Sequence, residues 1–254
     1  MKIIKATSKY DIQRRIIFPK INQDLAELVG ILTGDGYIGQ YILQDRIVSS
    51  IEISANKIKD LEYIEKFVSP LVKELFNLNP NIYKKKGENT LRLIIYSKDI
   101  FQFIKNLGFP PGKKGFISPP KWILNNKIFF RRFIRGFFDT DGCINLKNKE
   151  GKKYPVLNMG SKSEPLLKCI SVFLKNNRIS SYLGKIIAKD KRFKKESVTY
   201  KLEINGIKNI RLFYRFIGSN NPRNKMKYEE ANNLYGQGEN RTPDTRSFSA
   251  VLSH

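Results

Sequence analysis

Histidine, cysteine and tryptophan are scarce in this chain of 254 residues. The only histidine is His254, the last residue, which excludes a zinc finger, a histidine general base and a histidine-ligated metal nuclease. The two cysteines, Cys143 and Cys169, have no metal-ligand spacing and form no disulfide framework. Any chemistry must therefore rest on carboxylates, lysines, hydroxyls and bound metal.

Long apolar runs are also missing. The N-terminal stretch MKIIKATSKYDIQRR has no apolar run long enough for a signal peptide, and no later segment is apolar enough to span a membrane. With so few cysteines, we expect an intracellular, reducing location and no membrane partner. That location is the cytoplasm or nucleoid, or an organelle matrix if the gene is organellar.

Acidic residues are outnumbered two to one. The chain has 47 lysines and arginines against 23 acidic residues, which gives a formal net charge of +24. Such an excess is difficult to hold on a compact surface without an anion, so nucleic acid is the first candidate partner. A basic protein that is merely adhesive, or one docked on a ribosome, is the alternative that charge alone leaves open.

A repeated segment is the strongest internal signal. The segment from Leu25 to Ile38 reads LAELVGILTGDGYI, and the segment from Arg131 to Ile144 reads RRFIRGFFDTDGCI. After each copy, apolar periodicity predicts two strands, a helix, two more strands and a last helix. Each half therefore reads αββαββα, and the expected fold class is α+β with two pseudo-symmetric repeats.

The predicted boundaries follow from this pattern. We expect an N-terminal arm at 1–20, a first repeat at 21–109, a Pro- and Gly-rich linker at 110–127 and a second repeat at 128–230. The tail at 231–254 lacks periodicity and is predicted to be disordered. Its end, Glu239 to His254, also resembles the peptide that the reverse strand of a transfer-RNA gene would encode.

Small residues in the repeat predict how the two copies meet. Gly30 and Gly34 are four residues apart in the first copy, as are Gly136 and Thr140 in the second. If both copies are helices that pack along these small residues, their C-terminal ends meet. Two aspartates, Asp35 and Asp141, then lie together, and divalent cations would relieve their repulsion. The alternative is that each Asp-Gly pair is only a helix stop and a turn.

These residues identify a resemblance. LVGILTGDG (Leu28–Gly36) and IRGFFDTDG (Ile134–Gly142) resemble the two signatures of the LAGLIDADG homing endonucleases, in the double-motif, single-chain form. The resemblance covers about residues 20 to 230. The first copy departs from the usual pattern because Thr33 replaces an acid, whereas the second copy has Asp139 there.

The resemblance implies a fold, an activity and a set of site residues. Each repeat would contribute a four-stranded antiparallel sheet to a saddle on the DNA major groove, and the cuts would leave short 3′ extensions. The implied activity is hydrolysis of both strands of a duplex with a long recognition site, using Mg²⁺ or Mn²⁺ held at Asp35 and Asp141 beside Gly34 and Thr140. Lys114 and Lys225 are the expected catalytic lysines, with neighbouring Lys113 and Lys227 in equivalent places in the two halves.

Alternating strand residues supply the expected DNA contacts, either to base edges or to phosphates. In the first half these are Tyr37, Tyr41, Gln44, Arg46, Lys84, Lys86 and Arg92. In the second half they are Asn145, Lys147, Lys185, Lys189 and Lys201. A solvated strand face is the alternative for any one of them.

Three other functions remain for comparison. The same fold can serve as an intron-encoded maturase that binds its own intron RNA, or as a DNA-binding regulator that does not cut. Intact acids in both copies favour cleavage, and a structural basic protein does not explain the paired motifs. An intein-embedded form is not expected, since the chain has no nucleophilic first residue and no His-Asn ending. Two motifs in one chain predict a monomer.

Overall fold

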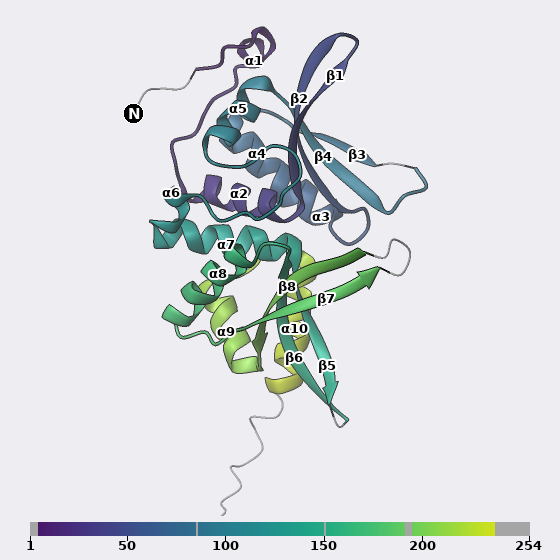
Figure 1. Cartoon of the computed structure of the whole chain (residues 1–254), viewed down its shortest axis with the longest axis vertical. Helices are drawn as coiled ribbons and strands as arrows, with labels where there is room; N and C mark the ends of the chain where they lie inside the picture. The colour runs from purple at the N-terminus through teal and green to yellow at the C-terminus, as the bar shows by residue number, and fades with distance from the viewer. Residues whose placement is uncertain (1–4, 85, 150, 191–194, 237–254) are drawn as a thin grey trace, which may run out of the picture.

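The computed structural model describes residues 5–84, 86–149, 151–190 and 195–236. Two halves lie one above the other, each a four-stranded antiparallel sheet with helices on one face (Figure 1). The strand orders are β1-β2-β4-β3 and β5-β6-β8-β7, so the two sheets have the same topology. The predicted α+β fold with two αββαββα repeats is confirmed.

The first half begins with a short helix and then follows the predicted pattern. Its elements are α1 (Lys9–Gln13), α2 (Gln23–Asp35), β1 (Gly36–Leu43), β2 (Arg46–Asn56), α3 (Leu61–Tyr63), the π-helical η1 (Ile64–Val68), α4 (Ser69–Phe76), β3 (Asn81–Lys84), β4 (Thr90–Tyr96) and α5 (Lys98–Asn106). The single helix predicted before β3 is thus three consecutive pieces with a π-helical middle turn. Its apolar side, including Ile64, Val68 and Val72, is buried as expected.

The second half repeats the arrangement after a linker. Its elements are α6 (Lys121–Leu124) within the linker, α7 (Lys127–Asp141), β5 (Gly142–Lys149), β6 (Lys152–Ser161), α8 (Glu164–Asn176), β7 (Tyr182–Asp190), β8 (Lys195–Asn205), α9 (Ile207–Phe216) and α10 (Pro222–Gly236). The α8 bounds agree with the apolar periodicity of the sequence. Across the described ranges, no helix is both long and apolar enough to cross a membrane.

The last helix differs from the sequence prediction. We expected the structured repeat to stop at residue 230, but α10 continues to Gly236. Its sequence is strongly polar, so it lacks the apolar periodicity on which the prediction relied. The helix is held by specific contacts instead: Ala231 is fully buried, and the Tyr228 ring stacks on Tyr214 of α9 with centroids 3.8 Å apart. The rest of the predicted tail, 237–254, lies outside the described residues.

Asparagine side chains start both central helices. The Asn22 side chain accepts a hydrogen bond from the Leu25 amide at 2.8 Å, and Asn126 accepts from Ile128 at 2.9 Å. Asparagine is a favoured N-cap because its side-chain oxygen satisfies an amide that has no intrahelical partner. Both helices then run through the middle of the molecule and pack directly against each other (Figure 1). The core of both halves is continuous around this helix pair.

Candidate active site

The helices α2 and α7 approach so closely that side chains are excluded from the contact. A Cβ atom on Gly30 would overlap the backbone carbonyl of Phe133, and one on Gly136 would overlap the carbonyl of Glu27. One turn later, a Cβ on Gly34 would overlap the Thr140 side chain. The four small residues that the repeat pattern singled out therefore lie at the contact between the helices. Larger side chains at the glycines would push the backbones apart.

Each central helix passes directly into a strand at its last residue. Gly36 and Gly142 cap α2 and α7 with extended backbone, so no turn separates helix from sheet. A Cβ on Gly36 would overlap Leu32, and one on Gly142 would overlap Phe138. Glycine is thus required here for close approach rather than for a positive φ. The Asp-Gly pairs are not turns, and each aspartate is fixed at a helix end by the strand that follows it.

Asp35 and Asp141 meet at the end of the helix contact. The Asp141 Oδ2 atom lies 3.4 Å from the position that a Cβ on Gly34 would take. Desolvation and the neighbouring charge of Asp35 raise the pKa of Asp141 to about 7, although part of its side chain reaches solvent. Desolvation also raises the pKa of Asp35, and Lys114 opposes that shift. Two carboxylates at one place repel each other, and Lys114 offsets part of this repulsion.

Lys114 from the linker lies at this site, beside both aspartates. Its Nζ donates to the carbonyl oxygens of Leu32 at 3.0 Å and Thr33 at 2.9 Å, and also to that of Gly34. Desolvation lowers the pKa of Lys114, whereas the charges of Asp141 and Asp35 oppose the shift. The ammonium group therefore satisfies the free carbonyl end of α2 and the negative pole of its dipole. Lys113, its neighbour, is exposed.

Uncharged amides serve the equivalent end of α7. Asn221 donates to the Asp139 carbonyl at 2.9 Å, and Asn224 donates to the Phe138 carbonyl at 3.3 Å. The Asp139 side chain is buried and accepts from the Asn220 amide at 2.8 Å and from the Ser219 hydroxyl. Burial raises the Asp139 pKa to about 7. The two helix ends are therefore satisfied by different groups, a cation in one half and neutral amides in the other.

The lysine predicted for the second half is not at the site. Lys225 is exposed on α10, and Lys227 forms an ion pair with Glu230 at 2.8 Å. The cation of α10 that acts on Asp35 is Arg223, whose Nη1 lies 3.3 Å from the Asp60 carboxylate. The expectation for Lys225 is not met: the chain forms α10 from Pro222 onward, and Lys225 is exposed on this helix.

A buried ion-pair network joins the two helices at their other end. Glu27 is fully buried, and Arg135 donates to both of its oxygens at 2.7 and 2.6 Å. Asn220 also donates to Glu27 at 2.7 Å, and Arg132 bonds to Asp24. The sequence did not reveal this network, since the partners come from different repeats and no local spacing relates them.

The donor set at the helix ends fits a hard divalent cation. Oxygen ligands from carboxylates are those that Mg²⁺ and Mn²⁺ prefer, and Asp35 and Asp141 supply two of them. Within the described ranges, no group of three or more His, Cys, Asp or Glu residues could hold a metal. Two carboxylates therefore leave ligand positions open for water and substrate oxygens. The Gly34 carbonyl, expected beside the metal, accepts a bond from Lys114, and the Thr140 hydroxyl donates back to the Phe137 carbonyl at 3.0 Å.

The face of each sheet away from the helices, here called the open face, carries most of the expected DNA contacts. Strand alternation and register place seven of the predicted residues there: Tyr37, Tyr41, Arg46, Arg92, Asn145, Lys147 and Lys201. Gln44 lies in the β1–β2 turn with a left-handed backbone, and Lys86 is exposed in the β3–β4 turn. The side chain of Lys189 lies outside the described residues.

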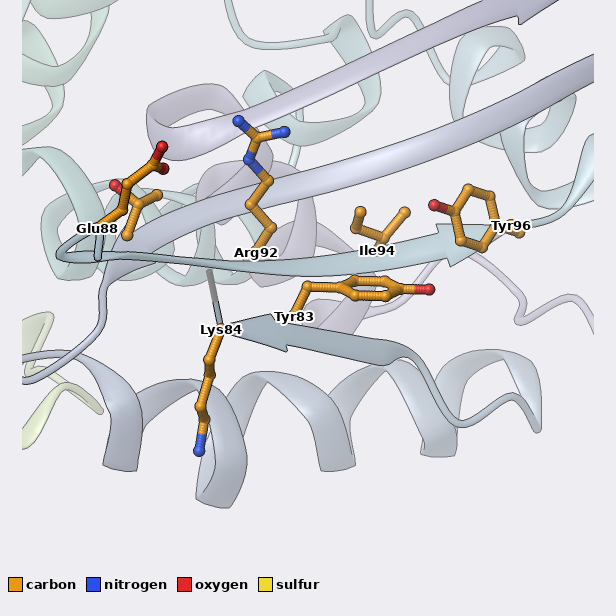
Figure 2. A pocket seen from close by; sticks show the side chains of 7 residues that line it. Tyr83, Lys84, Glu88, Arg92, Ile94 and Tyr96 are labelled. Atoms are coloured by element: carbon orange, nitrogen blue, oxygen red, sulfur yellow. The ribbon is translucent and has the colours of Figure 1, made fainter. Parts of the chain in front are cut away.

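Two predicted contacts lie on the wrong face. Lys84 points from β3 toward the helices and pairs with Glu65 at 2.8 Å, away from Tyr83 on the open face (Figure 2). Lys185 pairs in register with Tyr200, next to the buried pair Leu183 and Leu202, so it also lies on the helix side. Adjacent strand residues point to opposite faces, and the sequence did not show which lysine of a run takes which face.

Comparisons with known proteins agree with this geometry. Residues 129–218 match the family model described as LAGLIDADG-like domain. A solved structure of variants of the homing endonuclease I-DmoI has a TM-score of 0.54 at 22% identity and covers 77% of this chain and 95% of that one. The meganuclease I-AabMI bound to uncleaved DNA has a TM-score of 0.54 at 13% identity, covering 86% and 92%. At these identities the structures show the fold alone.

Curated relatives match over a small part of their length. A tRNA-splicing ligase RtcB from Pyrococcus furiosus is 30% identical over 205 residues, which cover 77% of this chain and 21% of that protein. A DNA polymerase from Thermococcus kodakarensis is 26% identical over 259 residues, covering 93% and 14%. The chain thus spans about a fifth or less of these relatives.

Proposed function

Because the chain carries a LAGLIDADG-like domain and has the fold of the double-motif LAGLIDADG homing endonucleases, we propose that it is a site-specific endonuclease that cuts both strands of duplex DNA. The observation that carries this proposal is the meeting of Asp35 and Asp141 at the ends of two helices from different repeats. A pair of carboxylates held this close is unfavourable unless a ligand neutralises it. A catalytic site that binds divalent metal would account for the two adjacent carboxylates.

Asp35 and Asp141 would hold the divalent ions, Mg²⁺ or Mn²⁺. Such ions supply charge neutralisation at a scissile phosphate and an activated water for in-line attack. The side chains of the protein then orient the duplex: the open faces of the two sheets flank the aspartates, and the net charge of +24 favours a polyanion. Lys114, beside both acids, is positioned to neutralise charge on a phosphate that reaches the site.

Relatives of the fold have been solved with such ligands. One I-DmoI structure is a complex with DNA and Mn, and I-SmaMI is bound to an uncleaved DNA target in the presence of calcium ions. These complexes of relatives support, for this chain, a duplex partner and a divalent metal. We extend the proposal to a single-chain monomer and to an intracellular location.

The test is selection of cleaved sites from a randomised duplex library with Mg²⁺ or Mn²⁺. The wild-type chain should enrich one long site, whereas Asp35→Asn and Asp141→Asn should bind that site without cutting it. Asp45→Asn is the matched control, since Asp45 is an exposed turn residue whose left-handed backbone suits asparagine. Wild-type binding without cleavage would point to a regulator or, if intron RNA binds more tightly, to a maturase. Failure to bind any duplex would refute the proposal.

A further inference from the structure

The open face of the first sheet contains a hollow of about 530 Å³, whose lining includes the polar residues Lys84, Glu88 and Thr90. Its floor is Ile94, which is 7% exposed, and its sides are the rings of Tyr83 and Tyr96 (Figure 2). Arg92 projects from β4, the strand that also carries Ile94 and Tyr96. Tyr83 lies on the neighbouring strand β3 and is 49% exposed. An apolar floor between aromatic rings is unusual on a surface expected to meet a polyanion.

Three tyrosines from different strands lie close together at this hollow. Burial and the neighbouring hydroxyls of Tyr41 and Tyr83 raise the pKa of Tyr96 to about 12. Tyr41 and Tyr83 lie on β1 and β3, the two outer strands of the same sheet.

The hollow lies close to the aspartates in strand register. Ile94 is paired with Glu52, and Glu52 with Tyr37, which comes two residues after Asp35. A duplex that reaches Asp35 along the first sheet therefore passes over Ile94. The side chains that it meets there include tyrosine rings, Ile94 and Arg92, together with the carboxylates of Glu52 and Glu88.

The second sheet also has a hollow on its open face, of about 560 Å³, with Tyr154 and the buried Val156 in its lining. At the register position of Ile94, however, the two sheets carry different residues. Gly36 and Gly142 are equivalent first residues of β1 and β5, so the strand pairings of the two sheets can be compared position by position. By this comparison, Glu203 corresponds to Ile94 and Asn205 corresponds to Tyr96. Gly184 replaces Tyr83. The carboxylate of Glu203 is held between two lysines, with Lys147 at 2.9 Å and Lys201 at 2.8 Å, so this face is charged and polar. The two repeats thus offer different chemistry to the two halves of a target.

We propose that the hollow of the first sheet receives the 5-methyl group of a pyrimidine in the major groove, so that one half-site is read by methyl contact. This inference rests on the proposed function, since it takes duplex DNA as the partner. The major-groove edge of thymine is the base edge that carries a methyl group, and apolar side chains are the groups that contact it. The same methyl group is present in 5-methylcytosine.

The experiment measures binding of the full chain to its selected site in Ca²⁺, without cleavage. Each thymine in turn is replaced by deoxyuridine, which removes only the methyl group. Burial of one such group corresponds to about a fourfold change in affinity. We expect this loss at one or two positions in the half-site bound by the first repeat. At the same positions, cytosine and 5-methylcytosine are compared with thymine to identify the source of the methyl group.

Variants assign the effect to the hollow. Tyr83→Ala removes one side of the hollow from an exposed position and should abolish the difference between thymine and deoxyuridine, whereas Tyr83→Phe retains the ring and should preserve it. Tyr182→Ala, at a 65% exposed tyrosine of the second sheet, is the control and should leave the difference unchanged. The inference is overturned if the chain binds one site but deoxyuridine is tolerated throughout, or if Tyr83→Ala leaves the penalty intact. If no duplex is bound, the proposed function fails with it.

Discussion

Replacing Lys114 with methionine removes an ammonium group from the end of α2 while keeping most of the apolar stem. Three carbonyl oxygens, those of Leu32, Thr33 and Gly34, lose their donor. A hydrogen bond to a charged group contributes about 1.5–3 kcal/mol, and a cation at a helix C-terminus contributes up to about 2 kcal/mol. These contributions share one group and are not additive, and desolvation of the lysine offsets part of them. We expect a net loss of about 2 kcal/mol.

The assay is thermal unfolding by circular dichroism at pH 7 without metal. For a chain of this size the loss corresponds to a decrease in Tm of roughly 4–8 °C. Lys113→Met is the control, because Lys113 is the exposed neighbour and should change Tm by about 1 °C or less. If both variants unfold at the same temperature, Lys114 does not support the end of α2, and the reasoning about that helix end is wrong.

Three further predictions concern the helix contact and its buried acids. Gly136→Ala should lower the free energy of unfolding in urea by about 3 kcal/mol, because the new Cβ overlaps the Glu27 carbonyl. Gly160→Ala is the control: its Cβ meets open space, so the loss should be about 0.5 kcal/mol or less. Arg135→Met should cost about 3 kcal/mol at pH 7, and less near pH 5, since burial raises the pKa of Glu27 and favours the neutral acid there. The folded state holds a proton on Asp139 up to about pH 7 that the unfolded chain has lost. The stability of wild type minus that of Asp139→Asn should therefore fall as pH rises from about 4 to about 7, by roughly 4 kcal/mol at most, and a flat difference would contradict the raised pKa.

The sequence was sufficient for features that repeat or alternate with a fixed period. The two motif helices could be predicted because apolar residues recur at helical spacing, and their contact because Gly30 and Gly136 lie at matched positions. The placement of Asp35 and Asp141 followed from those two inferences together. Such features are encoded locally, within one turn of helix or a few strand residues.

Contacts between distant residues that the repeat does not relate could not be predicted. Nothing near Asn221 in the sequence indicates that its amide meets the carbonyl of Asp139, and the polar helix α10 has no apolar stripe. Lys84 and Lys185 were misplaced for a different reason. Lys84 is followed by two more lysines, and Lys185 by Ile186 and Ile187, which point to opposite faces. In both cases the alternation that normally fixes the face carries little information.

The direct passage from α2 into β1 and from α7 into β5 restricts which insertions and deletions the chain can accept. Insertions are tolerated in loops, where extra residues can bulge into solvent without moving their neighbours. No loop exists at Asp35–Gly36 or at Asp141–Gly142. One added residue there would rotate the aspartate by about a third of a turn or exchange the two faces of the following strand. Length differences among chains of this fold should therefore accumulate at the hairpin turns and in the linker, and both acid–glycine junctions should keep their spacing.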